Sequence, residues 1–151
     1  MSDMQVAKPL VRVSLDDLQG AWEYLKPFMP GVVRVDDMRP GKLVIKRDES
    51  FLIMFKRDFY HSFKNHFPYV KKESGVPYGY GQIMSKILLN KALDAGVNWL
   101  VFVMPDRKVY KCHVKLFKKF YDKNQTDVPY LPGEIAMPLD FFEPLIKEQK
   151  L

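Results

Sequence analysis

Two stretches of the chain combine cationic side chains with aromatic rings, a pattern that suits binding to phosphates. They cover residues 55–73 and 106–123, and acidic residues are sparse in both. Cations neutralise a phosphate backbone, and flat rings can stack on unpaired bases. The pattern therefore predicts a surface for a polyanion. The alternative interpretation is a solvated lysine face with an aromatic core behind it.

Other residues that could do chemistry do not combine into a site. His61 and His66 are five residues apart, which does not match the spacing of a helical zinc pair. Residues 75–82 are rich in glycine but lack the Gly-Lys-Ser/Thr of a P-loop, so we interpret them as a flap over nucleic acid. Cys112 is the only cysteine, which excludes an intramolecular disulfide and favours a small packed side chain over a nucleophile.

The composition is that of one globular domain in a reducing compartment. The chain has 151 residues, of which 47% are hydrophobic and 28% are charged, and its net charge is +6. Its longest apolar run is too short for a membrane-spanning helix, and its start lacks the features of an export signal. We therefore expect a cytoplasmic protein with no membrane partner. A single domain should cover residues 1–151, with a core over 15–104 and a C-terminal extension over 105–151.

Hydrophobic spacing and chain breakers predict the elements that position these residues. Helical spacing begins after Ser14, a candidate capping residue, and stops at Pro27. A later helix should end at Gly96, and the apolar run that follows is typical of a strand buried on both faces. In order, we expect a helix over 15–26, strands over 32–35, 43–45 and 51–55, a loop over 68–81, a helix over 80–95, strands over 97–104 and 109–114, a short helix over 116–121, an edge strand over 134–138 and a helical turn over 140–146.

This order, with a strand pair before a long helix and a buried strand after it, resembles the core of the PD-(D/E)xK nucleases. That restriction-endonuclease-like superfamily includes the archaeal Holliday junction resolvases. The resemblance covers residues 15–104 and implies an α/β fold with a mixed central sheet flanked by helices. In the family, carboxylates hold Mg²⁺ and the lysine of a Glu-x-Lys motif positions or activates the attacking water. Lys56 stands at the position of that lysine.

The two motif acids do not follow the family pattern. The sequence reads Met54-Phe55-Lys56 where Glu-x-Lys is expected, and a thioether cannot bind Mg²⁺. It reads Pro40-Gly41-Lys42 where the Pro-Asp acid is expected. Both metal-binding carboxylates are therefore missing on the most direct alignment.

Nearby acids offer a partial substitute. Asp36 or Asp37, which follow the first expected strand, could supply the first acid, and Glu23 on the first helix a second. Asp58 lies two residues beyond Lys56, on the same face of an extended strand, and is the least strained replacement. An active nuclease would then use Lys56, Asp37 and Asp58 as catalytic residues with Mg²⁺ as cofactor.

The interpretation we favour is a nucleic-acid-binding protein of nuclease-like fold that has lost its catalytic carboxylates and needs no cofactor. It would bind DNA by charge and shape, with a role in repair or recombination. One alternative is the Mg²⁺-dependent, structure-specific endonuclease. Another is a scaffold subunit or homodimer that covers the apolar Met54 and Phe55 with a protein partner. The resemblance also implies that Gln82 opens the long helix and faces the site. The expected nucleic-acid contacts are Lys42, Arg57, Lys64, Lys71, Lys72 and Gln82.

Overall fold

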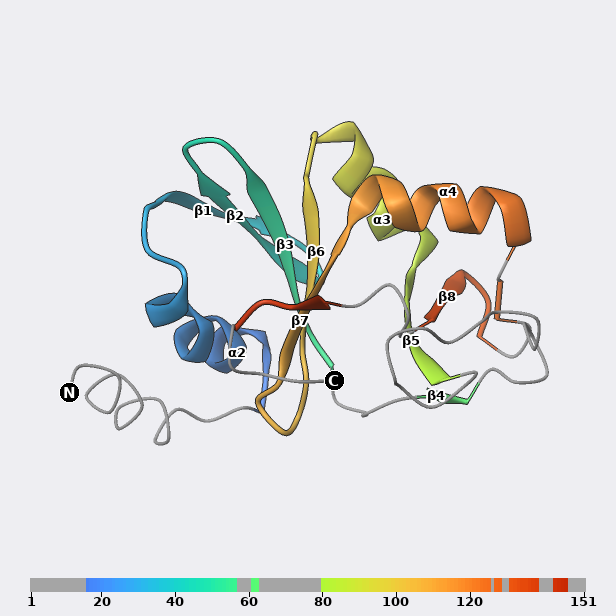
Figure 1. Ribbon diagram of the computed structural model, residues 1–151, viewed down its shortest axis with the longest axis horizontal. Coiled ribbons are helices and arrows are strands. Elements are labelled where there is room, and N and C mark those ends of the chain that lie inside the picture. Colours follow the sequence, from blue (N-terminus) through green and yellow to red (C-terminus); the bar gives the residue numbers. More distant parts are fainter. Residues whose placement is uncertain are drawn as a thin grey trace.

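The computed structural model describes residues 16–56, 61–62, 80–125, 127–128, 131–138 and 143–146. The strands of these described parts form two sheets, and the helices are interspersed among the strands along the chain (Figure 1). The elements are α2 (Leu18–Leu25), the 3₁₀ helix η1 (Lys26–Phe28), β1 (Val32–Met38), β2 (Gly41–Lys46), β3 (Ser50–Phe55), β4 (His61–Ser62), β5 (Tyr80–Ser85), α3 (Lys86–Asp94), β6 (Trp99–Val103), β7 (Val109–His113), α4 (Val114–Asn124), β8 (Glu134–Pro138) and β9 (Glu143–Pro144).

The larger sheet is mixed and has the strand order β1-β2-β3-β6-β7-β9. Strands β1, β2 and β3 form an antiparallel meander, and β6 lies parallel to β3 in a register that pairs Phe51 with Trp99. Strands β7 and β9 continue the sheet in antiparallel fashion. The mixed α/β class with a central sheet flanked by helices is therefore confirmed.

Strands β3 and β6 are buried on both faces, which explains their near-continuous apolar sequences. Alternate residues point to opposite faces, so Ile53 packs towards α2 while Met54 packs towards α3 and α4. We call these the α2 face and the α3/α4 face (Figure 1). The cluster on the α2 face consists of Ala21, Trp22, Tyr24, Leu25, Met29, Val44, Phe51, Ile53, Val101, Val103 and Val109. The α3/α4 face carries the larger cluster, which includes Leu52, Met54, Leu88, Leu89, Leu100, Phe102, Tyr110, Cys112 and Phe117.

The helix predicted over residues 80–95 is wrong in its first part. Residues 80–85 form strand β5, which pairs antiparallel with β8 and β4 in a separate three-stranded sheet. Helix α3 begins only after Ser85, whose hydroxyl oxygen accepts a hydrogen bond from the Leu88 amide at 3.2 Å. Ser85 is thus an N-cap, and β8 satisfies the backbone groups of the residues that precede it. The predicted end of this helix is confirmed, because Gly96 follows the helix with a φ of +73°.

Other boundaries shift for local reasons. The first helix begins at Leu18 because Asp17 caps it by accepting from the Gly20 amide at 2.8 Å, whereas Ser14 lies outside the described residues. Strand β1 extends through Asp36 and Asp37, which were expected to follow it. The short helix expected over 116–121 is longer, and the expected helical turn over 140–146 contains strand β9. Strand β8 is an edge strand as expected, although of the smaller sheet. Within the described ranges, no helix is long and apolar enough to cross a membrane.

Candidate functional site

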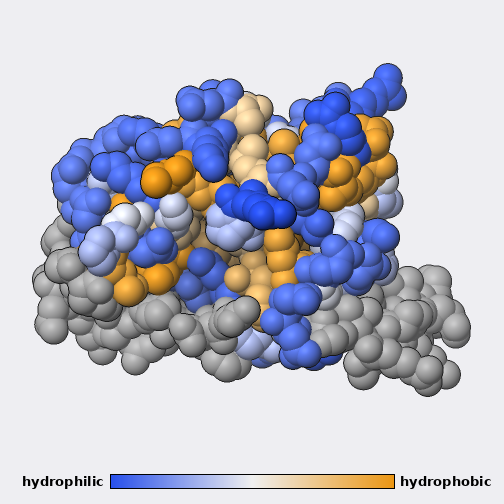
Figure 2. Space-filling view, turned by 180° about the vertical axis from the view of Figure 1, so that it is seen from behind, coloured by the Kyte–Doolittle hydropathy of each residue, from blue (hydrophilic) through white to orange (hydrophobic). Residues whose placement is uncertain are grey.

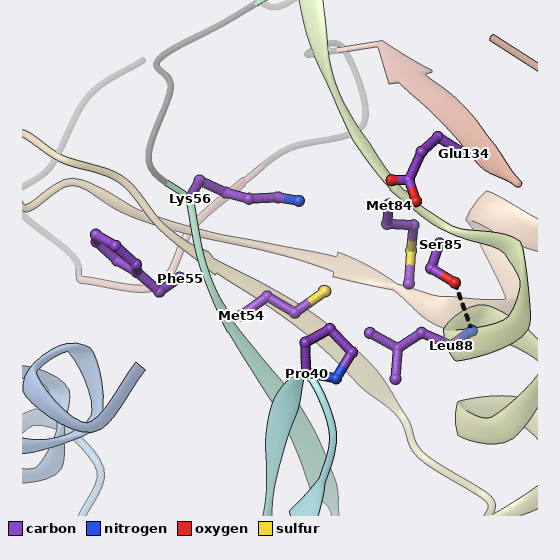
Figure 3. Close-up of a pocket in the computed structure, with 8 residues that line it drawn as sticks. All are labelled: Pro40, Met54, Phe55, Lys56, Met84, Ser85, Leu88 and Glu134. Atoms are coloured by element: carbon purple, nitrogen blue, oxygen red, sulfur yellow. Dashed lines mark hydrogen bonds between the residues drawn. The ribbon is translucent and has the colours of Figure 1, made fainter. Parts of the chain in front are cut away.

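A pocket of about 130 Å³ opens where the two sheets meet on the α3/α4 face. It lies between the carboxyl end of β3, the turn after β1, the junction of β5 with α3, and the start of β8 (Figure 3). Its walls are mostly apolar, with one ammonium group, one carboxylate and one hydroxyl among them. The lining residues are Pro40, Met54, Phe55, Lys56, Met84, Ser85, Leu88 and Glu134.

Lys56 follows β3 directly and reaches from the larger sheet towards the smaller one (Figure 3). Its backbone amide continues the sheet pairing by donating to the Val103 carbonyl at 2.9 Å. Its ammonium group donates to the carbonyl of Ile83 at 2.5 Å and lies 5.5 Å from the centroid of the Phe102 ring. Lys56 therefore joins β3 to β5, and any anion in the pocket would share this ammonium group with the β5 backbone.

The positions at which the nuclease resemblance requires acids cannot supply them in this backbone. Met54 is 4% exposed and lines the pocket with its thioether. Gly41 starts β2, and a Cβ atom there would lie 2.8 Å from both the Ile53 carbonyl oxygen and the Leu52 Cδ1 atom. An aspartate at position 41 would thus have to displace backbone as well as a side chain. The glycine is required by the close approach of β2 to β3.

Glu134 and Ser85 complete the polar lining of the pocket, and sequence reasoning missed both. Glu134 comes from β8, and Figure 3 shows its carboxylate on the side towards which Lys56 extends. The Ser85 hydroxyl oxygen is engaged by the Leu88 amide, which leaves its proton to donate. The capping position of Ser85 was recognisable in the sequence, because it precedes a run with helical spacing. Nothing local indicated Glu134, since it reaches the pocket only through the pairing of β5 with β8.

Asp37 and Lys42 lie on the opposite face of the sheet from Lys56. The register pairs Asp37 with Lys42 and Lys42 with Ile53, and cross-strand partners project to the same face. Ile53 belongs to the cluster on the α2 face, so Asp37 and Lys42 project there too. The two side chains form an ion pair of 3.5 Å, in which the Asp37 side chain is 74% exposed. The structure therefore does not bring Asp37 to Lys56.

Gln82 does not open a helix. It lies within β5, opposite Met137, and is 1% exposed. Its amide oxygen accepts a hydrogen bond from the backbone of Ile83 at 3.3 Å. A contact between this side chain and nucleic acid would first require it to leave the core.

The other expected site residues lie outside the described parts of the chain. They are Arg57, Asp58, Lys64, Lys71 and Lys72. Among the residues that are described, no group of three or more histidine, cysteine or acidic side chains could hold a metal ion. The described pocket offers a single carboxylate, from Glu134, whereas Mg²⁺ in phosphoryl chemistry is usually held by one or two carboxylates together with substrate phosphates.

Helix α4 carries the second basic stretch on the same side of the sheet as the pocket. It has four lysines against one aspartate, and that aspartate, Asp122, is paired with Lys118. The other three lysines, at positions 115, 119 and 123, are exposed. Lys86 at the start of α3 lies 5.1 Å from the Tyr121 ring centroid, and a hydrogen bond with Tyr121 raises the pKa of Lys86. The helices α3 and α4 thus carry several ammonium groups on this side of the larger sheet.

Comparisons with known proteins add no relative to this description. No family model, curated protein or solved structure matches the chain.

Proposed function

We propose that this protein binds DNA through the exposed surface of α4 by charge and shape, without cutting it. The observation that carries the proposal is the exposed lysine set of α4, on the same side of the sheet as the pocket that Lys56 lines. Only one acid interrupts this set along the helix, and Lys118 neutralises it. A surface of this kind contacts phosphates without reading bases, and its affinity falls with added salt because counterions are released.

The order of elements also supports the proposal. A helix, three antiparallel strands, a helix and a further strand occur in the order α2, β1-β2-β3, α3 and β6, with β4 and β5 of the smaller sheet between β3 and α3. This is the order on which the resemblance to PD-(D/E)xK nucleases rests, and Lys56 stands at the end of the strand that carries the motif lysine there. With Gly41 and Met54 in place of the acids, such a frame would retain binding and lack metal-assisted chemistry.

A matched pair of triple variants tests the proposal. Lys115→Ala/Lys119→Ala/Lys123→Ala removes three cations from α4. Lys26→Ala/Arg47→Ala/Lys108→Ala removes three exposed cations from elsewhere and changes the net charge equally. Fluorescence anisotropy with a labelled DNA duplex would measure the affinity of each variant over a range of salt concentrations. If each lysine meets one phosphate, the α4 variant should lower the slope of log affinity against log salt by about 2.7.

The control variant should keep most of the wild-type affinity and slope. Binding that is insensitive to salt, or an equal loss in both variants, would contradict the proposal. In the second case the net charge would account for binding, and the exposed lysines of α4 would have no specific part in it.

A further inference from the structure

Strand β1 forms one end of the larger sheet, and among the described residues no strand pairs with its outer side. Figure 1 shows it at the margin of the sheet, beyond β2. Of its seven residues, Val33 is 68% exposed and Val35 is 37% exposed. In Figure 2, which views the molecule from behind, apolar side chains reach the surface over this margin. An edge strand of this length presents a row of free backbone donors and acceptors.

Edge strands are usually protected from pairing by prolines, lysines or β-bulges, and β1 has few of these features. The sequence of β1, VVRVDDM, contains neither proline nor lysine, and its single irregularity lies at the start, between Val32 and Arg34. The stretch from Arg34 to Met38 pairs regularly with β2 and can accept another strand on its other side. The structure therefore has an edge that can continue the sheet into a second chain.

The charges on β1 point to the occupant. Arg34 and Asp36 lie on one face of the strand, and the Arg34 Nε atom is 2.8 Å from the Asp36 Oδ2 atom. The strand runs from residue 32 to residue 38, so Val35 is its midpoint. If a second β1 pairs antiparallel about a two-fold axis at Val35, Arg34 faces the partner's Asp36 and Asp36 faces the partner's Arg34. Four charges of alternating sign then meet in one square, and Val35 meets the partner's Val35.

Neighbouring two-fold registers are less favourable. An axis at Arg34 would place two guanidinium groups directly opposite each other, and an axis at Asp36 would place two carboxylates opposite each other. Like charges in directly opposed positions destabilise a strand pair. An axis between two residues is incompatible with a regular antiparallel pair, because directly opposed side chains would then project to opposite faces of the sheet. The sequence of β1 thus complements itself in one antiparallel register.

We propose that the protein forms a two-fold symmetric homodimer through β1, with the larger sheets of two copies joined into one continuous sheet. The interface is isologous, as is usual in homodimers. It lies at the β1 edge of the sheet and involves no residue of α4, so its test does not depend on the proposed DNA binding.

Charge-reversal variants test the register, because each variant is compared both alone and in an equal mixture with the other. Arg34→Asp makes positions 34 and 36 both acidic, and Asp36→Arg makes them both basic. In each variant alone, like charges of the two β1 strands would then face each other, so its dimer should dissociate at least about tenfold more readily than that of wild type. Mixed in equal amounts, the two variants should form a heterodimer, because each acidic edge then meets a basic one. Sedimentation velocity over a range of concentrations measures this directly.

Two further variants separate the edge from general surface effects. Val35→Lys should give a monomer, since it places two ammonium groups at the symmetry axis. Ile87→Lys, at a side chain in α3 that is 67% exposed, should leave the dimer intact. Circular dichroism establishes that each variant is folded.

A wild-type protein that stays monomeric up to near-millimolar concentration would overturn the proposal. So would a dimer that survives Val35→Lys, or variants that fail to associate when mixed. A wild-type protein that associates only with another protein would assign the edge to a different partner and would equally overturn it.

Discussion

The two faces of the larger sheet hold a lysine in different ways, although both lysines lie near the same end of the sheet. On the α3/α4 face, the Lys56 ammonium group is tied to the Ile83 carbonyl and lies over Phe102, beside a pocket lined by two methionines. On the α2 face, Lys42 is paired with Asp37 at the surface. The first arrangement is built into the packing of two sheets, and the second joins a partly buried lysine to an exposed carboxylate within one sheet.

The difference shows why residues that are close in sequence need not share a site. Asp37 and Lys56 lie near the same end of the larger sheet. They project to opposite faces because side chains alternate between the two faces along each strand. Glu134, which is 78 positions after Lys56, reaches the same pocket because β8 pairs with β5. The experiments below test whether the two faces differ in stability and solvation as this account requires.

The largest expected effect concerns how dry the α3/α4 face is. Burial, with a smaller contribution from Glu143, raises the pKa of the Cys112 thiol from 9.0 to about 12. Since the folded pKa lies above the unfolded one, the thiol contributes stability that is complete below pH 9 and is lost as the pH rises towards 12. Over that window the contribution falls by about 1.4 kcal/mol per pH unit.

Urea unfolding of wild type and Cys112→Ala at about pH 8 and about pH 10.5 measures this loss. Cys112→Ala lacks the titrating group, so the free energy of unfolding of wild type should fall relative to that of the variant as the pH rises. A difference that does not change with pH would mean that solvent reaches the thiol and that the cluster on the α3/α4 face is not closed.

The next effect is steric and concerns the start of β2. Gly41→Ala should lower the free energy of unfolding by about 1–3 kcal/mol, because the new Cβ atom meets the Ile53 carbonyl oxygen and the Leu52 side chain. Lys42→Ala, one position along and on the α2 face, should cost less than about 1 kcal/mol. Urea unfolding at neutral pH compares the two. A Gly41→Ala variant as stable as wild type would show that a carboxylate could be accommodated there.

The smallest effect compares the two lysines directly. Lys56→Met leaves the Ile83 carbonyl without this donor and should lower the free energy of unfolding by about 1–2 kcal/mol. Lys42→Met keeps an apolar stem of similar length and breaks an ion pair whose carboxylate is largely exposed, so it should change the free energy of unfolding by less than about 0.5 kcal/mol. Thermal unfolding of both variants measures the difference. Equal costs would mean that Lys56 is no more engaged in packing than Lys42.

Local patterns predicted most of the larger sheet. The apolar run of β6 indicated a strand buried on both faces, and the polar residues between β2 and β3 indicated a hairpin; the structure has both. The error at β5 arose because Ile83 and Ile87 fit helical spacing, while the pairing partner of β5 lies some 50 residues later in β8. Strand pairing over such a separation leaves no local mark in the sequence.

The site was less predictable than the fold. The position of Lys56 at the end of β3 follows from the hairpin alone, but its contact with Ile83 depends on the smaller sheet. The same holds for Gln82, which a helix would have exposed and which β5 buries. Single-sequence reasoning therefore placed Lys56 at the end of β3, and it failed for the residues that the second sheet brings to the pocket.

The central proposal is that this protein binds DNA without cutting it. The most direct test incubates labelled junction and duplex DNA with excess protein in Mg²⁺ or Mn²⁺, and follows complex formation and strand integrity in the same samples. The account predicts complexes that dissociate as salt is raised and DNA that stays intact in both metals. Metal-dependent cleavage that is abolished by Lys56→Met or Glu134→Gln would contradict it and identify the pocket as an active site.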